Sequence, residues 1–281
     1  MPVREKRTGL HFEKVTRGAA KSVFLRSPHN EIVGVTIPYD GSGESGDAVG
    51  ACRVAGGALA WVIDVEGKGP SVAPAANALY RAAYGHSSNG ITNPANILSA
   101  LHATCLAHET RAAATVFHIS GSAVTIGVAG VQPPIIFNSD SGHATRVEAN
   151  GMTLGFPFDP TFTLASIDLP PTSILLAGSD GFYEAEDDTG ELIDVAEFAR
   201  VLKGHQEVSM ASNLVRILEA VSEHSPRQLD DLSVMMLRCS EPMSSSAAAA
   251  VSVRPRIPGS FSVEPPAHYY TMTDAVCGVL I

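Results

Sequence analysis

The sequence predicts an α+β fold: a sandwich of two antiparallel β-sheets with helices packed on the outside. Two observations carry this prediction. Short segments rich in β-branched and apolar residues dominate the chain and are separated by glycine-rich or polar turns. Two pairs of helical segments are inserted between the runs of strands. A chain with this pattern buries both kinds of element when the sheets stack and the helices cover them.

The expected strands form two groups along the chain. In the first group, Gly56-Gly57 makes a two-residue turn that suits a tight hairpin. This group comprises Lys21–Arg26, Glu31–Tyr39, Ala51–Ala55 and Ala58–Val65. The second group comprises Thr115–Ile119, Val124–Val128, Pro133–Phe137, Thr161–Leu169, Ser173–Ala177 and Leu232–Leu237.

Four helical segments are expected between these strands. Asn93 can cap the second helix, which has a proline in its first turn. Apolar residues of the second and the fourth helix fall on one face. The segments are Ser71–Tyr84, Pro94–His108, Val195–Leu202 and Ala211–Val221.

The amino-acid composition changes along the sequence and divides the chain into three regions. Residues 1–239 contain all the expected strands and helices and form the predicted globular domain. Residues 240–268 are rich in Ser, Ala and Pro and are expected to be a flexible linker. Residues 269–281 are an apolar C-terminal tail.

The composition argues against several classes of protein. The 281 residues are 45% apolar and 17% charged, which is typical of a globular protein. A net charge of −10 argues against a nucleic-acid binder that works through broad phosphate contacts. Neither a membrane-spanning run nor a signal peptide is visible. The four cysteines lie far apart without a C-x-x-C pair, as buried thiols of a reducing compartment do. We therefore expect a soluble cytoplasmic protein.

Carboxylates stand at the boundaries of several predicted strands. Asp47 opens one strand, Asp64 closes another, Asp180 follows a third, and Asp230 and Asp231 precede the last. An isolated carboxylate is costly to bury and normally finds a cation or hydrogen-bond donors. Because few lysines or arginines lie nearby in the sequence, the acids suggest a shared divalent cation such as Mg²⁺ or Mn²⁺. Any single one of them is more often a turn residue or a helix cap, so the prediction depends on their combination.

Lys68 lies between two glycines just behind Asp64. A lysine in such a turn is either solvated or in contact with a substrate phosphate, and the sequence leaves both possibilities open. The segment Gly67–Ser71 (GKGPS) resembles part of a nucleotide-binding P-loop. In that motif Ser or Thr follows the lysine, whereas here Gly69 does, which argues against nucleoside triphosphate binding.

Taken in order, these acids and their neighbours resemble the PPM-type, metal-dependent Ser/Thr protein phosphatases, specifically the bacterial SpoIIE-type branch. That branch reads GGDxxD, DvsGhG followed by alanines, AGHxPP, TDGvxEa and DDxT. The resemblance spans roughly residues 40–239 and implies the same sandwich fold. The corresponding segments are Ser45–Gly50 (SGDAVG), Asp64–Gly69 (DVEGKG), Ala129–Pro134 (AGVQPP), Ser179–Ala185 (SDGFYEA) and Asp230–Ser233 (DDLS).

The resemblance implies a role for each matching acid. Asp64 would bridge two Mn²⁺ or Mg²⁺ ions, and the carbonyl of Val65 would be a further ligand. Asp47 would lie near the ions and bind them directly or through water. Asp180 and Asp230 would hold the second ion from the opposite sheet. Catalysis would then depend on Asp64 and Asp180, while a metal-bound hydroxide attacks the phosphorus.

The resemblance leaves one ligand open and includes three departures. Asp231 could exchange roles with Asp230. Gly50 stands where the branch has a second acid, which thins the outer shell of carboxylates. Lys68 and Val131 each replace a histidine; Lys68 keeps a positive charge that could face the substrate phosphate, and Val131 is expected to affect packing.

Two classes of function follow from the resemblance. The first is a metal-dependent phosphatase that acts on phosphoserine or phosphothreonine in a small regulatory protein of a partner-switching circuit. The second is a catalytically weak or silent protein of the same fold that acts as a regulatory binding module. All four metal aspartates of the branch are present, which favours the enzyme.

Overall fold

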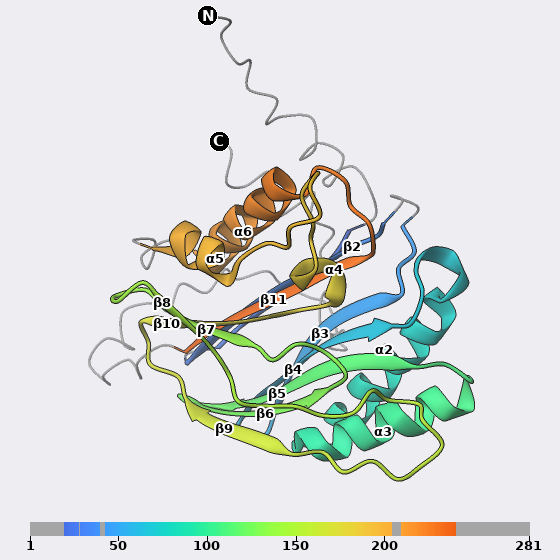
Figure 1. Ribbon diagram of the computed structural model, residues 1–281. Helices are drawn as coiled ribbons and strands as arrows, with labels where there is room; N and C mark the ends of the chain where they lie inside the picture. The colour runs from blue at the N-terminus through green and yellow to red at the C-terminus, as the bar shows by residue number, and fades with distance from the viewer. Residues whose placement is uncertain (1–19, 28, 40–42, 204–208, 240–281) are drawn as a thin grey trace, which may run out of the picture.

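The computed structural model describes residues 20–27, 29–39, 43–203 and 209–239, and these form four layers (Figure 1). Two antiparallel sheets stack face to face, and a pair of helices covers the outer face of each. The predicted α+β sandwich is therefore confirmed. The linker predicted at 240–268 and the tail predicted at 269–281 lie outside the described residues.

One sheet has six strands and the other has five, and each strand is antiparallel to its neighbours. In spatial order, the six-stranded sheet consists of β1 (Lys21–Arg26), β2 (Asn30–Ile37), β11 (Leu232–Cys239), β10 (Ser173–Gly178), β7 (Ile135–Asn138) and β8 (His143–Arg146). The five-stranded sheet consists of β3 (Asp47–Val54), β4 (Gly57–Val65), β5 (Ala112–Ser120), β6 (Ala123–Ala129) and β9 (Leu164–Asp168).

The helices are divided between the two outer faces. In Figure 1, α2 (Ala73–Ser88) and α3 (Pro94–Ala107) lie to the right of and below the five-stranded sheet, and α5 (Val195–Leu202) and α6 (Met210–His224) lie above the six-stranded sheet. The short helix α4 (Asp180–Tyr183) follows β10. The predicted cap of α3 is present, because the Asn93 side chain accepts a hydrogen bond from the backbone N–H of Ala95.

Strand β4 shows how the sequence builds three apolar layers. Side chains of a strand alternate between its two faces. Ala58, Ala60 and Val62 pack between the sheets, whereas Leu59 and Trp61 pack against the helices α2 and α3. The strand is thus buried on both faces, which is why it reads as one continuous apolar run. A third apolar cluster lies between the six-stranded sheet and α5 and α6.

The strands and helices differ from the prediction in small ways. Helix α2 begins at Ala73 rather than Ser71 and continues to Ser88, and β2 ends at Ile37 rather than Tyr39. The sequence did not predict β8 or α4. Strand β8 lies at a sheet edge and is mostly exposed, so it carries no apolar alternation. Helix α4 spans a single turn, which is too short for a periodic pattern.

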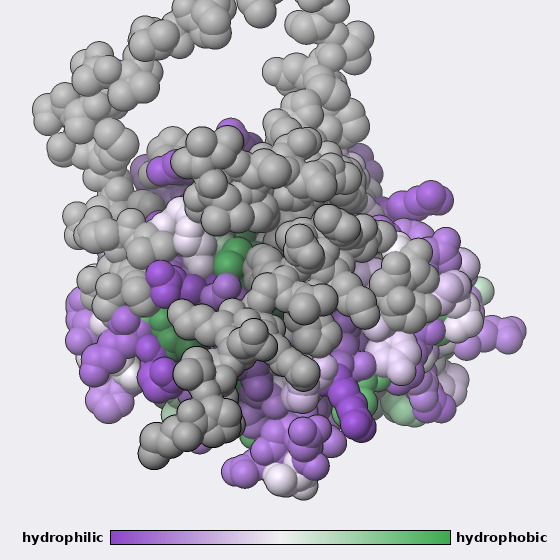
Figure 2. All heavy atoms as spheres, turned by 90° about the horizontal axis from the view of Figure 1, so that it is seen from above, coloured by the Kyte–Doolittle hydropathy of each residue, from purple (hydrophilic) through white to green (hydrophobic). Residues whose placement is uncertain are grey.

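The described atoms on the face shown in Figure 2 are mostly polar. In the space-filling view from above, hydrophilic residues dominate the described atoms, and apolar residues show as separate small areas (Figure 2). None of the described helices is both long and apolar enough to cross a bilayer.

Candidate metal centre

Asp47 and Asp64 face one another across two neighbouring strands. They are register partners in the antiparallel pair of β3 and β4. Asp64 stands two residues after Val62, so alternation along β4 directs its side chain to the space between the sheets. Like charges directly opposite each other on neighbouring strands destabilise a sheet. This pair of acids is therefore an unfavourable arrangement that a bound cation would relieve.

Asp47 is a buried carboxylate that lacks a full set of partners. Its side chain is buried, and its Oδ2 accepts no hydrogen bond from the described residues. Burial raises the pKa of Asp47 well above its ordinary value, and the charge of Asp64 raises it further, while the hydroxyls of Ser179 and Ser233 partly offset both effects. An orphaned carboxylate oxygen at such a place is a ready ligand for a hard cation.

Asp64 is linked directly to the opposite sheet. Its Oδ2 accepts a hydrogen bond of 3.1 Å from the backbone N–H of Asp180, the first residue of α4. Burial raises the pKa of Asp64 to about 7, and the charges of Asp180 and Asp230 add to the increase. Three acids from two sheets thus act on one another electrostatically.

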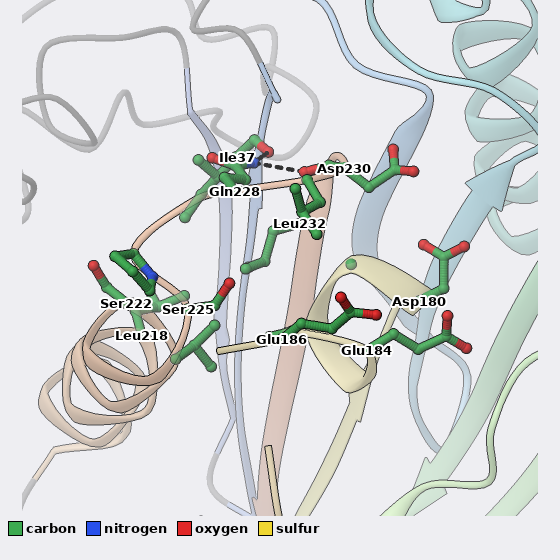
Figure 3. A pocket seen from close by; sticks show the side chains of 15 residues that line it. Ile37, Asp180, Glu184, Glu186, Leu218, Ser222, Ser225, Gln228, Asp230 and Leu232 are labelled. Atoms are coloured by element: carbon green, nitrogen blue, oxygen red, sulfur yellow. Dashed lines mark hydrogen bonds between the residues drawn. The ribbon is translucent and has the colours of Figure 1, made fainter. Parts of the chain in front are cut away.

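Asp180 and Asp230 are brought together by close backbone packing. A Cβ atom on Gly181 would lie 2.1 Å from the carbonyl oxygen of Asp231, so only glycine allows α4 to approach the start of β11 this closely. Gln228 fixes the loop before β11 by donating from Nε2 to the carbonyls of Ile37 and Asp230 (Figure 3). In Figure 3 the carboxylates of Asp180 and Asp230 lie on the same side of the loop.

Asp231 differs from its neighbour Asp230 in what it contacts. Asp231 is buried, and its carboxylate accepts backbone hydrogen bonds from Tyr39 (2.8 Å), Gly46 (2.7 Å) and Gly69 (3.1 Å). Asp230 is half-buried, and burial and the charge of Asp180 raise its pKa. Asp231 therefore ties three loops together, while Asp230 accepts one backbone hydrogen bond, at its Oδ1.

Val65 and Lys68 lie at the end of β4 and on the loop that follows it. Val65 is buried, and its N–H donates to the carbonyl of Gly46. Lys68 Nζ donates to the carbonyl of Leu229 at 2.6 Å, lies 3.8 Å from Asp230 Oδ2, and sits 4.6 Å above the Tyr39 ring. The lysine is thus held in place rather than freely solvated.

Gly50, the position where the SpoIIE-type branch has a second acid, does not face the centre. It pairs with Trp61, whose indole would lie 2.5 Å from a Cβ atom on residue 50. Trp61 packs towards α2 and α3. Residue 50 therefore belongs to the helix-facing side of β3, and glycine there leaves room for the indole.

Two cavities flank the acids. One, of about 220 Å³, lies between α4, α6 and the loop before β11 (Figure 3). The other, of about 350 Å³, lies beside the start of β5. Asp180 and Glu184 line both cavities. The acidic centre is therefore open to a substrate from two sides.

The acids present fit a divalent cation, although no three His, Cys, Asp or Glu side chains of the described residues form a preformed cage. The unsatisfied oxygen of Asp47 and the raised pKa of Asp64 both indicate that these carboxylates lack a neighbouring positive charge. Lys68 is the cation that contacts one of the acids in the described part of the chain. Oxygen ligands of this kind suit Mg²⁺ and Mn²⁺.

Comparison with protein families agrees with this geometry. A sequence model of the stage II sporulation protein E (SpoIIE) family matches residues 55–240. The chain belongs to the SpoIIE family. The matched range includes Asp64, Asp180 and Asp230, and Asp47 lies just before it. No curated protein matches the sequence.

Solved structures of SpoIIE-like and related phosphatases share the fold. The SiaA-PP2C domain of Pseudomonas aeruginosa superposes with a TM-score of 0.63 at 18% identity, over 74% of this chain and 85% of that one. The RsbU and RsbW domains of Rv1364c from Mycobacterium tuberculosis superpose with a TM-score of 0.62 at 19% identity, over 81% of this chain and 64% of that one. The catalytic domain of the serine threonine phosphatase PstP, solved with two manganese ions, superposes with a TM-score of 0.57 at 13% identity, over 76% of this chain and 99% of that one. This SpoIIE-family chain thus has the fold of the PPM phosphatases.

Proposed function

We propose that this chain is a metal-dependent protein serine/threonine phosphatase. The observation that carries the proposal is the meeting of Asp47 and Asp64 from one sheet with Asp180 and Asp230 from the other, at an edge open to solvent on two sides. The matching family and the phosphatases that share the fold support it.

Each acid has a separate task in this proposal. Asp64 lies centrally and would bridge two Mn²⁺ or Mg²⁺ ions, with the Val65 carbonyl beside it. Asp47 would complete the shell of the first ion, and Asp180 and Asp230 would hold the second. Bound ions of this kind supply a hydroxide at neutral pH and neutralise the phosphoryl group. Asp64 and Asp180 are the residues on which catalysis depends.

The substrate that we propose is a phosphoserine or phosphothreonine of a regulatory protein of the partner-switching kind. Among the structural neighbours, one holds RsbU and RsbW domains together in one chain. We also propose that the chain acts in the cytoplasm. The three cysteines that the structure describes, Cys52, Cys105 and Cys239, are buried and free, as expected in a reducing compartment.

Hydrolysis of p-nitrophenyl phosphate tests the proposed reaction. The full chain is expected to release p-nitrophenol in the presence of Mn²⁺ and to stop when the metal is chelated. Phosphate release from a phosphoserine protein would extend the result to the proposed substrate class. A folded chain that binds Mn²⁺ by calorimetry but hydrolyses neither compound would refute the enzyme and leave a binding module.

Removing the charge of Lys68 is expected to strengthen binding of Mn²⁺. Its Nζ lies 3.8 Å from Asp230 Oδ2, so it repels an ion held there. Because both side chains are partly exposed, solvent weakens this repulsion, and we expect Lys68→Met to lower the Kd for Mn²⁺ by about 2- to 5-fold. Calorimetric titration measures the change. Weaker binding would instead mean that Lys68 positions Asp230. A contact between Lys68 and substrate phosphate stays a prediction.

A further inference from the structure

Arg111 is the cation that lines a cavity beside the acids. The larger cavity is lined by four acids (Asp64, Glu66, Asp180 and Glu184) and by Arg111. The smaller cavity is lined by Asp180, Glu184, Glu186 and Asp230 and by no lysine or arginine of the described residues. Four carboxylates line each entrance to the acidic centre, and the larger one also contains a guanidinium, so a phosphoryl dianion is less strongly repelled there.

The backbone of Arg111 is fixed against the loop that carries the acids. Its carbonyl accepts a hydrogen bond of 3.0 Å from the N–H of Glu66. Two residues further on, Ala113 is the register partner of Asp64. Arg111 is thus anchored within a few residues of the central acid, and a shift of β5 would move both together.

The guanidinium of Arg111 is oriented but lightly held. Its central carbon lies 4.8 Å from the centre of the Phe156 ring, in a cation–π contact. Its Nη1 lies 3.6 Å from Glu66 Oε2, and the two side chains are 51% and 65% exposed. An ion pair this exposed contributes little, so an incoming anion can replace Glu66 at small cost.

We propose that Arg111 binds the phosphoryl group of the substrate and the phosphate product through the larger cavity. This inference rests on the proposed phosphatase function. A guanidinium presents two parallel N–H donors, which match two oxygens of a phosphate group. Lys68, by contrast, already contacts the Leu229 carbonyl, Asp230 and the Tyr39 ring. Glu66 competes with the phosphate for Arg111 and lowers its affinity.

Calorimetric titration of inorganic phosphate into the Mn²⁺-loaded full chain tests this role without requiring turnover. Arg111→Ala is expected to raise the Kd for phosphate about 10- to 100-fold, and Arg111→Lys about 3- to 10-fold, because lysine keeps the charge but not the paired donors. Glu66→Gln is expected to lower the Kd about 2- to 5-fold. The double variant Arg111→Ala with Glu66→Gln separates loss of the arginine from exposure of the glutamate.

Arg200→Ala is the matched control. Arg200 is an exposed arginine on α5 that pairs with Glu197, and its removal is expected to leave phosphate binding unchanged. The inference is overturned if wild type binds no phosphate, or if the double variant binds it as tightly as Glu66→Gln alone while both bind Mn²⁺ normally. Failure of p-nitrophenyl phosphate hydrolysis in wild type would refute the proposed function instead, since the titration reads binding alone.

Discussion

Asp64→Asn is expected to reduce Mn²⁺-dependent hydrolysis of p-nitrophenyl phosphate by about 1000-fold or more. Asp64 stands opposite Asp47 on the neighbouring strand and accepts the N–H of Asp180, so it links the two sheets. Asparagine can still accept that hydrogen bond but cannot bridge two cations. Turnover with Mn²⁺, measured beside a calorimetric metal titration, checks the result. Retained turnover with normal metal binding would remove Asp64 from the centre.

The same variant is expected to stabilise the metal-free protein, and the effect should depend on pH. The folded-state pKa of Asp64 is raised to about 7 from an ordinary value of 3.8. The folded state therefore binds this proton more tightly than the unfolded state, so its contribution to stability is present below pH 4 and is lost as the pH rises towards 7. The asparagine side chain of the variant does not ionise and avoids this loss.

Melting curves of the metal-free proteins measure this dependence. The difference in unfolding free energy between Asp64→Asn and wild type is expected to grow from near zero at pH 4 to roughly 1–3 kcal/mol at pH 7.5. Asp64→Ala, which also loses the hydrogen bond from Asp180, should gain less. A difference in unfolding free energy that stays constant with pH would show that the folded surroundings do not raise the pKa of Asp64.

Asp231→Ala is expected to destabilise the fold by about 3–5 kcal/mol. The substitution leaves the N–H groups of Tyr39, Gly46 and Gly69 without their acceptor, and the bonds from Gly46 and Gly69 are buried. Asp231→Asn should recover part of the loss, because one side-chain oxygen remains while the amide group faces backbone donors. Urea unfolding of the metal-free chain measures both.

Asp230→Asn, one residue away, is the matched control for this experiment. Asp230 is half-buried, and its Oδ1 accepts a hydrogen bond from the backbone N–H of Asp231, which asparagine can also accept. The substitution should change metal-free stability by less than about 1 kcal/mol and weaken Mn²⁺ binding strongly. If Asp230→Asn instead unfolds the chain and Asp231→Asn instead loses metal, the two acids have exchanged the roles given above.

The sequence predicted the sandwich and its elements well where periodic patterns decide the structure. The run from Ala58 to Val65 identified a buried strand, and the step from Ile63 to Asp64 marked its acidic end. Strand β8 escaped prediction because its partner β7 supplies its hydrogen bonds, while its own side chains are mostly exposed. Such an element depends on tertiary pairing and leaves no pattern in the sequence.

The acids that the fold brings together were easier to single out from the sequence than the groups around them. Asp230 and Asp231 are identical in type and adjacent, and the difference between them lies in three N–H donors from distant loops. Arg111 precedes a strand like many exposed arginines, and its neighbours Glu66 and Phe156 are far away in sequence. Only the folded chain brings these groups together.

The bond between the N–H of Asp180 and the carboxylate of Asp64 crosses from one sheet to the other. Three of the five proposed ligands (Asp47, Asp64 and the Val65 carbonyl) therefore belong to the five-stranded sheet, and two (Asp180 and Asp230) lie next to strands of the six-stranded sheet. Neither sheet alone carries a complete set. A cation bound there would favour the folded chain over the unfolded one by mass action, so its concentration would set the melting temperature as well as the rate of hydrolysis. The supply of metal would then affect the lifetime of the folded protein, because the ion joins the strand pair β3 and β4 to the short helix α4.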